Sequence, residues 1–546
     1  MNKLFLILFE SFLIIISNSK INNFICKADR LKITPLHLNY TENENKRRLA
    51  IDYSPIKIGL DYSSFSQPSS MSAENFEKLK SLIESTTSEF QKFLKVQHTD
   101  YDLSGKEESI KKSCQISSIG TGYGNFLVDN DVVIFPTFNS EMGENEISSG
   151  KLCLTLGNRP RPTLGLLQIN PNFNFDKKNS DLFMKKILFH EITHILVFDI
   201  NLLRQLGMTT TRNSRLYVNS AKVLARAKRH FNCASLYGLP LEDQEYEGVL
   251  SDSHWDARYM LGDYMIPAFY PDMVLSDITL SLFEDTKYYK VDYYSGGLFK
   301  FGKNKGCSFT TEKCINNNSP LSEEFCTTNG GAICSTSRIT KGYCIINDYI
   351  NYNISIPKQF QYFENPNHGG YFHADFCPVA DIVSSSEDYL PNNCKIGSSS
   401  LSSDYGEVMG DTSFCFVSSL TPSSSNDNII SRPICYKAEC NEETKQIVVH
   451  VGDSSLICPT DGGIQVGNGF KGIITCPKYY DICDTESNEL CNDMFDCLNK
   501  KIEVSDDSFY MSNNISFDRY IPTISSEYIQ NNYYIFLFLF LTNILF

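Results

Sequence analysis

The segment from Ser180 to Phe198, SDLFMKKILFHEITHILVF, constrains the fold of this chain more than any other part of the sequence. It contains no Pro or Gly, it begins with Ser and Asp, and its apolar residues recur at helical spacing. We therefore predict a mostly buried helix around which the rest of the domain is organised. The apolar positions are Leu182, Met184, Ile187, Leu188, Ile195 and Leu196.

Two histidines, His190 and His194, lie four residues apart on this predicted helix. Residues at this spacing share one face, so the two imidazoles can converge on one metal ion. Glu191 projects about 100° around the helix from His190, and it is better placed to hold a metal-bound water than to be a ligand. The H-E-x-x-H pattern is typical of zinc-dependent proteases. Taken alone, the pattern also fits a pair of buried structural histidines.

The length and the charge of the chain narrow its class. A chain of 546 residues is too long for one compact core, so we expect two or three domains. The net charge of −15 argues against nucleic acid or an anionic membrane surface as a partner.

Cysteine is concentrated in the second half of the chain. Fifteen of the nineteen cysteines fall between Cys307 and Cys497, and they do not form the C-x-x-C pairs that zinc ribbons require. Such a density is typical of disulfide-bonded proteins outside the reducing cytosol. We therefore predict a cysteine-rich domain over residues 307–510 in a secreted or surface protein.

The N-terminal segment agrees with secretion. Lys3 precedes an apolar run from Leu4 to Ile16 and then small polar residues, which is the layout of a signal peptide over residues 1–19. Four N-x-S/T triplets are compatible with glycosylation in the secretory pathway. They begin at Asn39, Asn317, Asn353 and Asn514.

The C-terminal segment, residues 511–546, combines a polar spacer with an apolar tail. The tail runs from Tyr533 to Phe546 and is preceded by the small residues Ser525 and Ser526. This arrangement is typical of a glycolipid-anchor signal, which would attach the protein to the membrane. A short tail anchor or an unprocessed secreted tail remains an alternative.

Residues 20–49 have little periodic pattern, and we interpret them as a pro-region with a possible processing point at residues 46–48, Lys-Arg-Arg. The segment contains Cys26, and the remaining eighteen cysteines are an even number that could all pair. A thiolate at Cys26 could occupy the open zinc position and keep an enzyme latent until the segment is cut off. An ordinary unpaired cysteine is the alternative.

From Ala50 the pattern becomes that of a folded domain, and we assign residues 50–200 to an N-terminal catalytic subdomain of mixed helix and sheet. Alternating and continuous apolar runs predict strands, and helical spacing predicts two further helices. The expected strands are Ile56–Leu60, Asp131–Phe135 and Leu164–Ile169, and the expected helices are Ser72–Val96 and Asn219–His230.

A catalytic zinc usually takes three protein ligands, and no histidine follows within six residues of His194. His254, in the sequence S-H-W-D, is the later histidine with the most informative neighbours. Met265 follows eleven residues later in D-Y-M-I-P, and a Met in a tight turn beneath the ligands is typical of metzincins. Taken singly, His254 would also fit an ordinary surface or core histidine, and Met265 a core filler. We assign both to a central subdomain, residues 201–306.

The combination of HEITH, a sixty-residue step to the next histidine, SHWDAR and DYM resembles the leishmanolysin family of surface zinc metalloproteases. The resemblance extends to RPTLGLLQINP, DFCPVAD, RPICYKAEC, SSLICPTDGG and GIITCPKYYDIC. It implies an α+β fold, with a metzincin-like catalytic domain built on a long active-site helix and a disulfide-rich, mainly β C-terminal domain. It also implies one zinc ion per chain and a role for each of six residues. His190, His194 and His254 would be zinc ligands, Glu191 the catalytic base, Met265 the Met-turn residue and Cys26 the pro-region cysteine.

The chain departs from the family pattern at one position. The family usually has a small residue, most often Gly, three positions after the second His, and this chain has Val197. Gly allows a sharp helix end. The end of the helix is therefore the point at which this site could differ from those of the family, although no ligand is removed.

The resemblance implies a zinc metalloendopeptidase that hydrolyses peptide bonds of extracellular or surface proteins. The same resemblance implies that the substrate lies extended in a cleft above the active-site helix, beside a sheet edge, and Leu164–Ile169 is our candidate for the edge strand. A cell-surface adhesion protein with a weak or vestigial protease site is the alternative function. A purely structural disulfide-rich coat protein would leave the helix, the distant His and the Met turn as three coincidences.

Overall fold

The fold is described from a computed structural model. The predicted signal peptide, the basic residues 46–48, the C-terminal tail and most of the predicted pro-region lie outside the described residues. The structure describes residues 26, 33–38, 53–99, 103–120, 129–143, 146–176, 180–246, 249–270, 272–292, 299–382, 392–395, 405–425, 429–459, 462–467, 469–483, 494–495 and 498.

A five-stranded mixed sheet, in the order β1-β6-β7-β5-β3, forms the scaffold of the first half of the chain. The central strands are long because their apolar runs are covered on both faces, and β6 runs antiparallel to β7 while β5 runs parallel to it. The strands are β1 (Leu36–Leu38), β3 (Ile58–Leu60), β5 (Val132–Phe138), β6 (Ser148–Leu156) and β7 (Arg161–Ile169).

The prediction that Leu164–Ile169 is an edge strand is wrong. These residues belong to β7, which lies between β6 and β5 and is hydrogen-bonded to both. A continuous apolar run indicates that both faces of a strand are buried, and such strands occur in the middle of a sheet. Neither edge of β7 can therefore accept a substrate strand.

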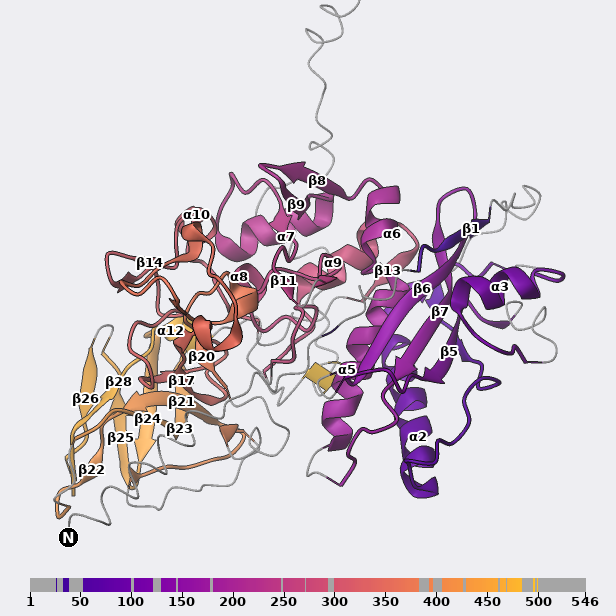
Figure 1. The fold of residues 1–546 in the computed structure, drawn as a ribbon. Helices are drawn as coiled ribbons and strands as arrows, with labels where there is room; N and C mark the ends of the chain where they lie inside the picture. Colours follow the sequence, from indigo (N-terminus) through magenta and orange to yellow (C-terminus); the bar gives the residue numbers. More distant parts are fainter. Residues whose placement is uncertain are drawn as a thin grey trace, which may run out of the picture. The chain divides into compact units, whose positions relative to one another are not determined.

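The predicted central helix is α5 (Ser180–Leu196), which lies beside β6 and β7 in Figure 1. Two glycines allow this close approach. A Cβ atom on Gly150 of β6 would lie 1.9 Å from the carbonyl oxygen of Glu191, and one on Gly165 of β7 would lie 2.1 Å from the Ile195 side chain. On α5 the ring of Phe189 stacks on Phe90 at 4.2 Å between centroids.

Phe90 is the last residue of α2 (Ala73–Phe90), and the N-cap of this helix is Ser72. The predicted extension of this helix to Val96 is wrong. Residues Leu94–Val96 form β4, which pairs with β13 (Tyr289–Val291) and β2 (Ser54–Pro55). The pairing with β13 involves residues almost two hundred positions away, so tertiary contacts override the helical spacing.

The central part of the chain contains short helices and a small three-stranded sheet, in the order β10-β9-β8. The predicted helix Asn219–His230 is observed as α7. The elements of this central part include α6 (Ile200–Gln205), β8 (Thr209–Arg212), β9 (Arg215–Val218), α7 (Ala221–Phe231), β10 (Leu239–Pro240), β12 (Val249–Leu250), α8 (Ala257–Met260) and α9 (Asp277–Asp285).

The cysteine-rich part is mainly β and contains most of the disulfides. Eight disulfides are present among the described residues, and six of them join cysteines between Cys314 and Cys483. The protein is therefore an α+β protein with a disulfide-rich C-terminal domain. Its elements include α10 (Cys307–Thr311), η5 (Phe372–Ala374) and a six-stranded antiparallel sheet of β25 (Ser454–Ile457), β24 (Gln446–Val451), β23 (Arg432–Asn441), β21 (Ser413–Ser418), β28 (Ile473–Thr475) and β26 (Gly463–Gln465).

Among the described residues, no helix has both the length and the apolar character that a bilayer-spanning helix needs.

Candidate metal centre

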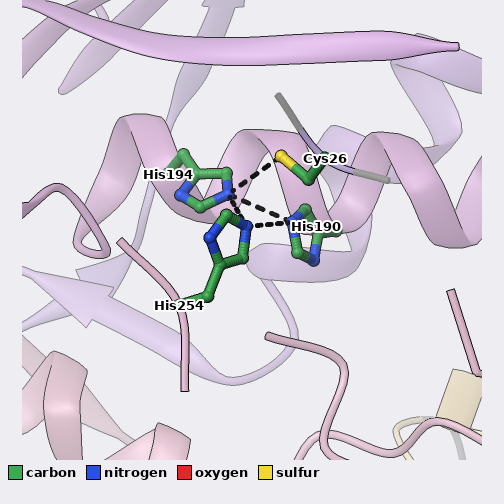
Figure 2. Close-up of side chains that lie close together, drawn as sticks. All are labelled: Cys26, His190, His194 and His254. Carbon is green, nitrogen blue, oxygen red and sulfur yellow. Dashed lines mark hydrogen bonds between the residues drawn. The ribbon is translucent and has the colours of Figure 1, made fainter. Parts of the chain in front are cut away.

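Three histidines and one cysteine that are far apart in the sequence meet in one buried cluster (Figure 2). His190 and His194 come from α5, and His254 comes from the segment between β12 and α8. The three Nε2 atoms lie 3.0 to 3.2 Å from one another. The structure thus brings together the three histidines named from the sequence.

The other ring nitrogen of each histidine bonds to the backbone. Each Nδ1–H donates to a carbonyl oxygen. His190 donates to Tyr264 at 2.6 Å, His194 to Phe198 at 2.8 Å and His254 to Ser251 at 3.0 Å. These bonds assign the protons to Nδ1, so the three Nε2 lone pairs converge. Converging lone pairs repel one another unless a cation lies between them.

The cluster fits zinc. A tetrahedral zinc ion with nitrogen ligands at about 2.0 to 2.1 Å requires nitrogens about 3.3 Å apart. Burial lowers the pKa of all three histidines well below 6.5, and in each case a neighbouring histidine acts in the same direction. The imidazoles are therefore neutral, as metal ligands must be.

The Cys26 sulfur lies beside these nitrogens. Its Sγ is 3.5 Å from Nε2 of His194, and its backbone N–H donates to the carbonyl oxygen of Pro267 at 2.8 Å. Zinc with sulfur at about 2.3 Å and nitrogen at about 2.0 Å places the two ligand atoms about 3.5 Å apart in tetrahedral geometry. The sulfur therefore lies where a fourth ligand would lie if the three histidines held a zinc ion.

Glu191 lies next to the cluster. Its carboxylate accepts the backbone N–H of Gly150 at 2.6 Å and the Cys26 thiol at 3.7 Å. Gly150 was not singled out in the sequence, and the only signal was a glycine inside a strand. The arrangement leaves a buried carboxylate oriented by β6 beside the position that Cys26 occupies.

Met265 lies in a buried turn that contacts both ligand segments. Its carbonyl oxygen accepts the backbone N–H of Trp255, the neighbour of His254, at 2.9 Å. The preceding residue, Tyr264, accepts the His190 Nδ1–H, and its hydroxyl bonds to Thr193 on α5 at 2.9 Å. The turn therefore holds His190 and His254 at fixed positions.

Asp263 is a site residue that the sequence analysis missed. Its carboxylate accepts the Met265 N–H at 2.8 Å and the hydroxyls of Ser276 and Thr279 at 2.5 and 2.8 Å. The Thr279 hydroxyl also accepts the indole N–H of Trp255 at 2.8 Å. Asp263 thus joins the Met turn to the neighbour of His254. The hydroxyl donors lie more than ten residues away, so no local pattern indicates the network.

Asp263 is expected to make stability depend on pH. Burial raises the pKa of Asp263 from its ordinary value of 3.8 to about 6, although four hydrogen bonds act in the opposite direction. The folded state therefore binds this proton more tightly, and the resulting stabilisation is complete below about pH 3.8 and lost as the pH rises through about 6. The melting temperature of the wild type relative to Asp263→Asn should fall between pH 4 and pH 7. A constant difference would contradict this assignment.

Val197 does not prevent the helix from turning. Helix α5 ends at Leu196, and the backbone N–H of Phe198 donates to the carbonyl oxygen of Thr193 at 3.0 Å. Val197 is fully buried and is not among the residues with positive φ. Because the turn uses no left-handed residue at this position, it does not require Gly there, and it still places the Phe198 carbonyl oxygen against His194.

Comparison with known proteins finds one matching family model and several similar proteins. The family model described as leishmanolysin, peptidase M8, matches residues 79–489. The chain is 29% identical over 350 residues to a leishmanolysin homolog of Crithidia fasciculata, covering 60% of this chain and 51% of that protein. It is 27% identical over 343 residues to leishmanolysin of Leishmania tropica, covering 59% and 50%. It is 24% identical over 332 residues to the ciliated left-right organizer metallopeptidase of Danio rerio, covering 56% and 48%. The chain thus spans about half the length of these curated relatives.

Proposed function

We propose, from the premise that the chain belongs to the leishmanolysin family of metallopeptidases, that it is a zinc metalloendopeptidase acting on extracellular or surface proteins. The observation that carries the proposal is the convergence of three neutral Nε2 atoms with a buried carboxylate beside them. His190, His194 and His254 would hold one zinc ion. Bound zinc would supply a water of lowered pKa and polarise the scissile carbonyl.

Glu191 is the general base of the proposed reaction. Its carboxylate takes a proton from the attacking water and returns it to the nitrogen of the leaving amine. The Gly150 N–H, 2.6 Å from Oε2, orients the carboxylate for both transfers. In the uncut chain Glu191 is fully buried, with the Cys26 thiol against its carboxylate.

The edge of β6 is the proposed docking site for an extended substrate. Strand β1 pairs with β6 at Leu154–Leu156, and no other described strand pairs with that edge. The Gly150 N–H, which is not used in pairing with β7, points to Glu191, so this edge borders the centre. A substrate added as a strand beside Ser148–Cys153 would place a peptide bond next to Glu191.

Cys26 is the proposed latency switch. Its sulfur occupies the place that the attacking water needs, and its segment also supplies β1 at the edge of β6. Cutting the chain after the pro-region would release both contacts. The eight disulfides support a secreted or surface location, with a lipid anchor as the proposed membrane attachment.

Metal removal tests the proposed reaction. After removal of the pro-region, the protein should hydrolyse an unstructured protein such as casein, and a zinc chelator should abolish this hydrolysis. Stoichiometric zinc should restore it, whereas Mg²⁺ should not, because three imidazoles suit zinc and hard cations prefer oxygen ligands. A folded, zinc-loaded protein that cuts no unstructured substrate would favour the adhesion function instead.

A further inference from the structure

The third proposed ligand, His254, is supported differently from the other two. His190 and His194 are fixed by the hydrogen bonds of a long buried helix. His254 lies in a turn between the two-residue strand β12 and the four-residue helix α8. Segments of this kind have little stability of their own, so the position of His254 depends on contacts with other parts of the chain.

One such contact starts two residues after His254. The Asp256 carboxylate caps α8 by accepting the Arg258 N–H at 2.7 Å, and its other oxygen forms an ion pair with the Arg215 guanidinium of β9. The Asp256 side chain is 1% exposed. An unpaired carboxylate buried to this extent would be costly, so Asp256 and the turn before it are tied to Arg215.

Arg215 also contacts the cysteine-rich half. Its Nη2 lies 3.4 Å from the Asp375 carboxylate, which follows η5, and its Nε lies 3.2 Å from Asp243. The Asp375 side chain is 5% exposed and accepts the Gln244 amide N–H at 3.1 Å. We call Arg215, Asp243, Asp256 and Asp375 the Arg215 cluster. The three carboxylates are close enough to hold a cation, and the cation between them is the Arg215 guanidinium.

Asp375 is held rigidly within its own half. It adopts positive φ, and its carbonyl oxygen accepts the Tyr362 hydroxyl at 3.1 Å. Cys377, two residues later, is joined to Cys314. A carboxylate fixed by the backbone and by a disulfide can position a partner, because it loses little conformational freedom on pairing.

Two further contacts connect the same region to the cysteine-rich half. Arg258 of α8 donates to the carbonyl oxygens of Phe309 and Glu312 at 3.0 and 3.2 Å. The carbonyl oxygen of His254 accepts the N–H of Glu242 at 3.1 Å, and the Glu242 carboxylate lies 3.3 Å from Nδ1 of His373 in η5. The His254 segment is thus contacted through both its backbone and α8.

From these contacts we propose that the cysteine-rich half positions His254 for metal binding through the Arg215 cluster, so that the metal site is incomplete without that half. The inference rests on the proposed function, because it takes His254 to be a zinc ligand. Arg215 and Asp375 are positioning residues, and neither touches the substrate or the metal.

The test measures metal binding in the full-length protein. Partners behind metal ligands typically change affinity by about 10- to 100-fold. Asp375→Asn and Arg215→Met should therefore speed zinc transfer to a competing chelator by about tenfold or more. The absorption bands of the Co²⁺-substituted protein should also shift, because the geometry at His254 relaxes. Arg215→Lys should recover part of the loss, since it restores the charge without the planar fork.

Glu407→Gln is the matched control. Glu407 forms an ion pair with Lys341 at 3.0 Å inside the cysteine-rich half, and its side chain is buried, as that of Asp375 is. The Glu407→Gln substitution should lower the melting temperature. It should leave the rate of zinc release within about twofold of the wild-type rate, because substitutions at distant sites act independently. If Arg215→Met does not fold, the isosteric Asp375→Asn, which keeps an acceptor for Gln244, decides the question.

The outcomes separate the two proposals. The positioning role alone would be overturned by the following result. The wild type binds zinc, the His254→Ala variant does not, and the Asp375→Asn variant releases zinc no faster than the Glu407→Gln variant. Wild-type protein that folds and binds no zinc would overturn the proposed function and the positioning role together. Faster release in Asp375→Asn, with Glu407→Gln unchanged, would support the inference.

Discussion

In the Glu191→Gln variant, hydrolysis of an unstructured protein is expected to fall by about 10²- to 10⁴-fold, the range that a positioned general base contributes. The amide keeps an oxygen that can accept the Gly150 N–H, which now lies 2.6 Å from the carboxylate. It cannot accept a proton from water. Zinc should stay bound, because Glu191 is not among the four residues whose ligand atoms converge.

The measurement compares kcat and KM with zinc content in the same samples. Glu89→Gln is the matched control, because Glu89 is also a buried carboxylate but pairs with Lys92 and Lys185 away from the centre. It should keep full zinc content and nearly full activity at a temperature below its melting point. Chelator-sensitive activity that survives in Glu191→Gln would mean that another group is the base.

In the Cys26→Ala variant, the uncut full-length protein is expected to be active, at least about tenfold above the uncut wild type. A tethered thiolate has a high effective concentration at the position it occupies, and here Sγ lies 3.5 Å from Nε2 of His194. Removing the sulfur opens that position to water. Strand β1 would still cover part of the β6 edge.

The assay must be accompanied by gel analysis showing that the pro-region is intact. Co²⁺ in place of zinc gives a second signal, since the sulfur-to-metal charge-transfer band of the full-length protein should vanish in Cys26→Ala. Thr155→Val is the control, because it removes the 3.0 Å bond to His37 of β1 and leaves the thiol in place, so latency should persist. An inactive Cys26→Ala chain that activates normally after cutting would assign latency to β1 rather than to the thiol.

Much of what the sequence predicted depends on residues that are close together in the chain. The spacing of apolar residues predicted α5, and the four-residue step predicted that His190 and His194 share a face, because helical geometry depends only on nearby positions. The density of cysteines after Cys307 indicated a disulfide-bonded domain without its pairing. The fold class followed from these local patterns together with the resemblance to a family.

The predictions failed where distant segments compete. Leu94–Val96 continues a helical pattern but pairs with β13, and the apolar run of β7 indicated a strand without showing that it lies between β6 and β5. Strand order and register depend on contacts between residues far apart, and local periodicity does not contain that information.

For the candidate metal centre too, some features followed from the sequence and others only from the tertiary structure. The sequence by itself determined the chemistry of the residues, namely two histidines and a glutamate on one helix, a later histidine with a Met turn, and one cysteine ahead of the domain. Only the tertiary structure decided which backbone oxygens fix the imidazole tautomers and that Gly150 and Asp263 support the site. It also connected Asp375 of the cysteine-rich half, through Arg215, to Asp256, which lies two residues after the third histidine. The reason is physical: residue type sets what a side chain can bind, whereas the distances that make it bind arise when separate segments pack together.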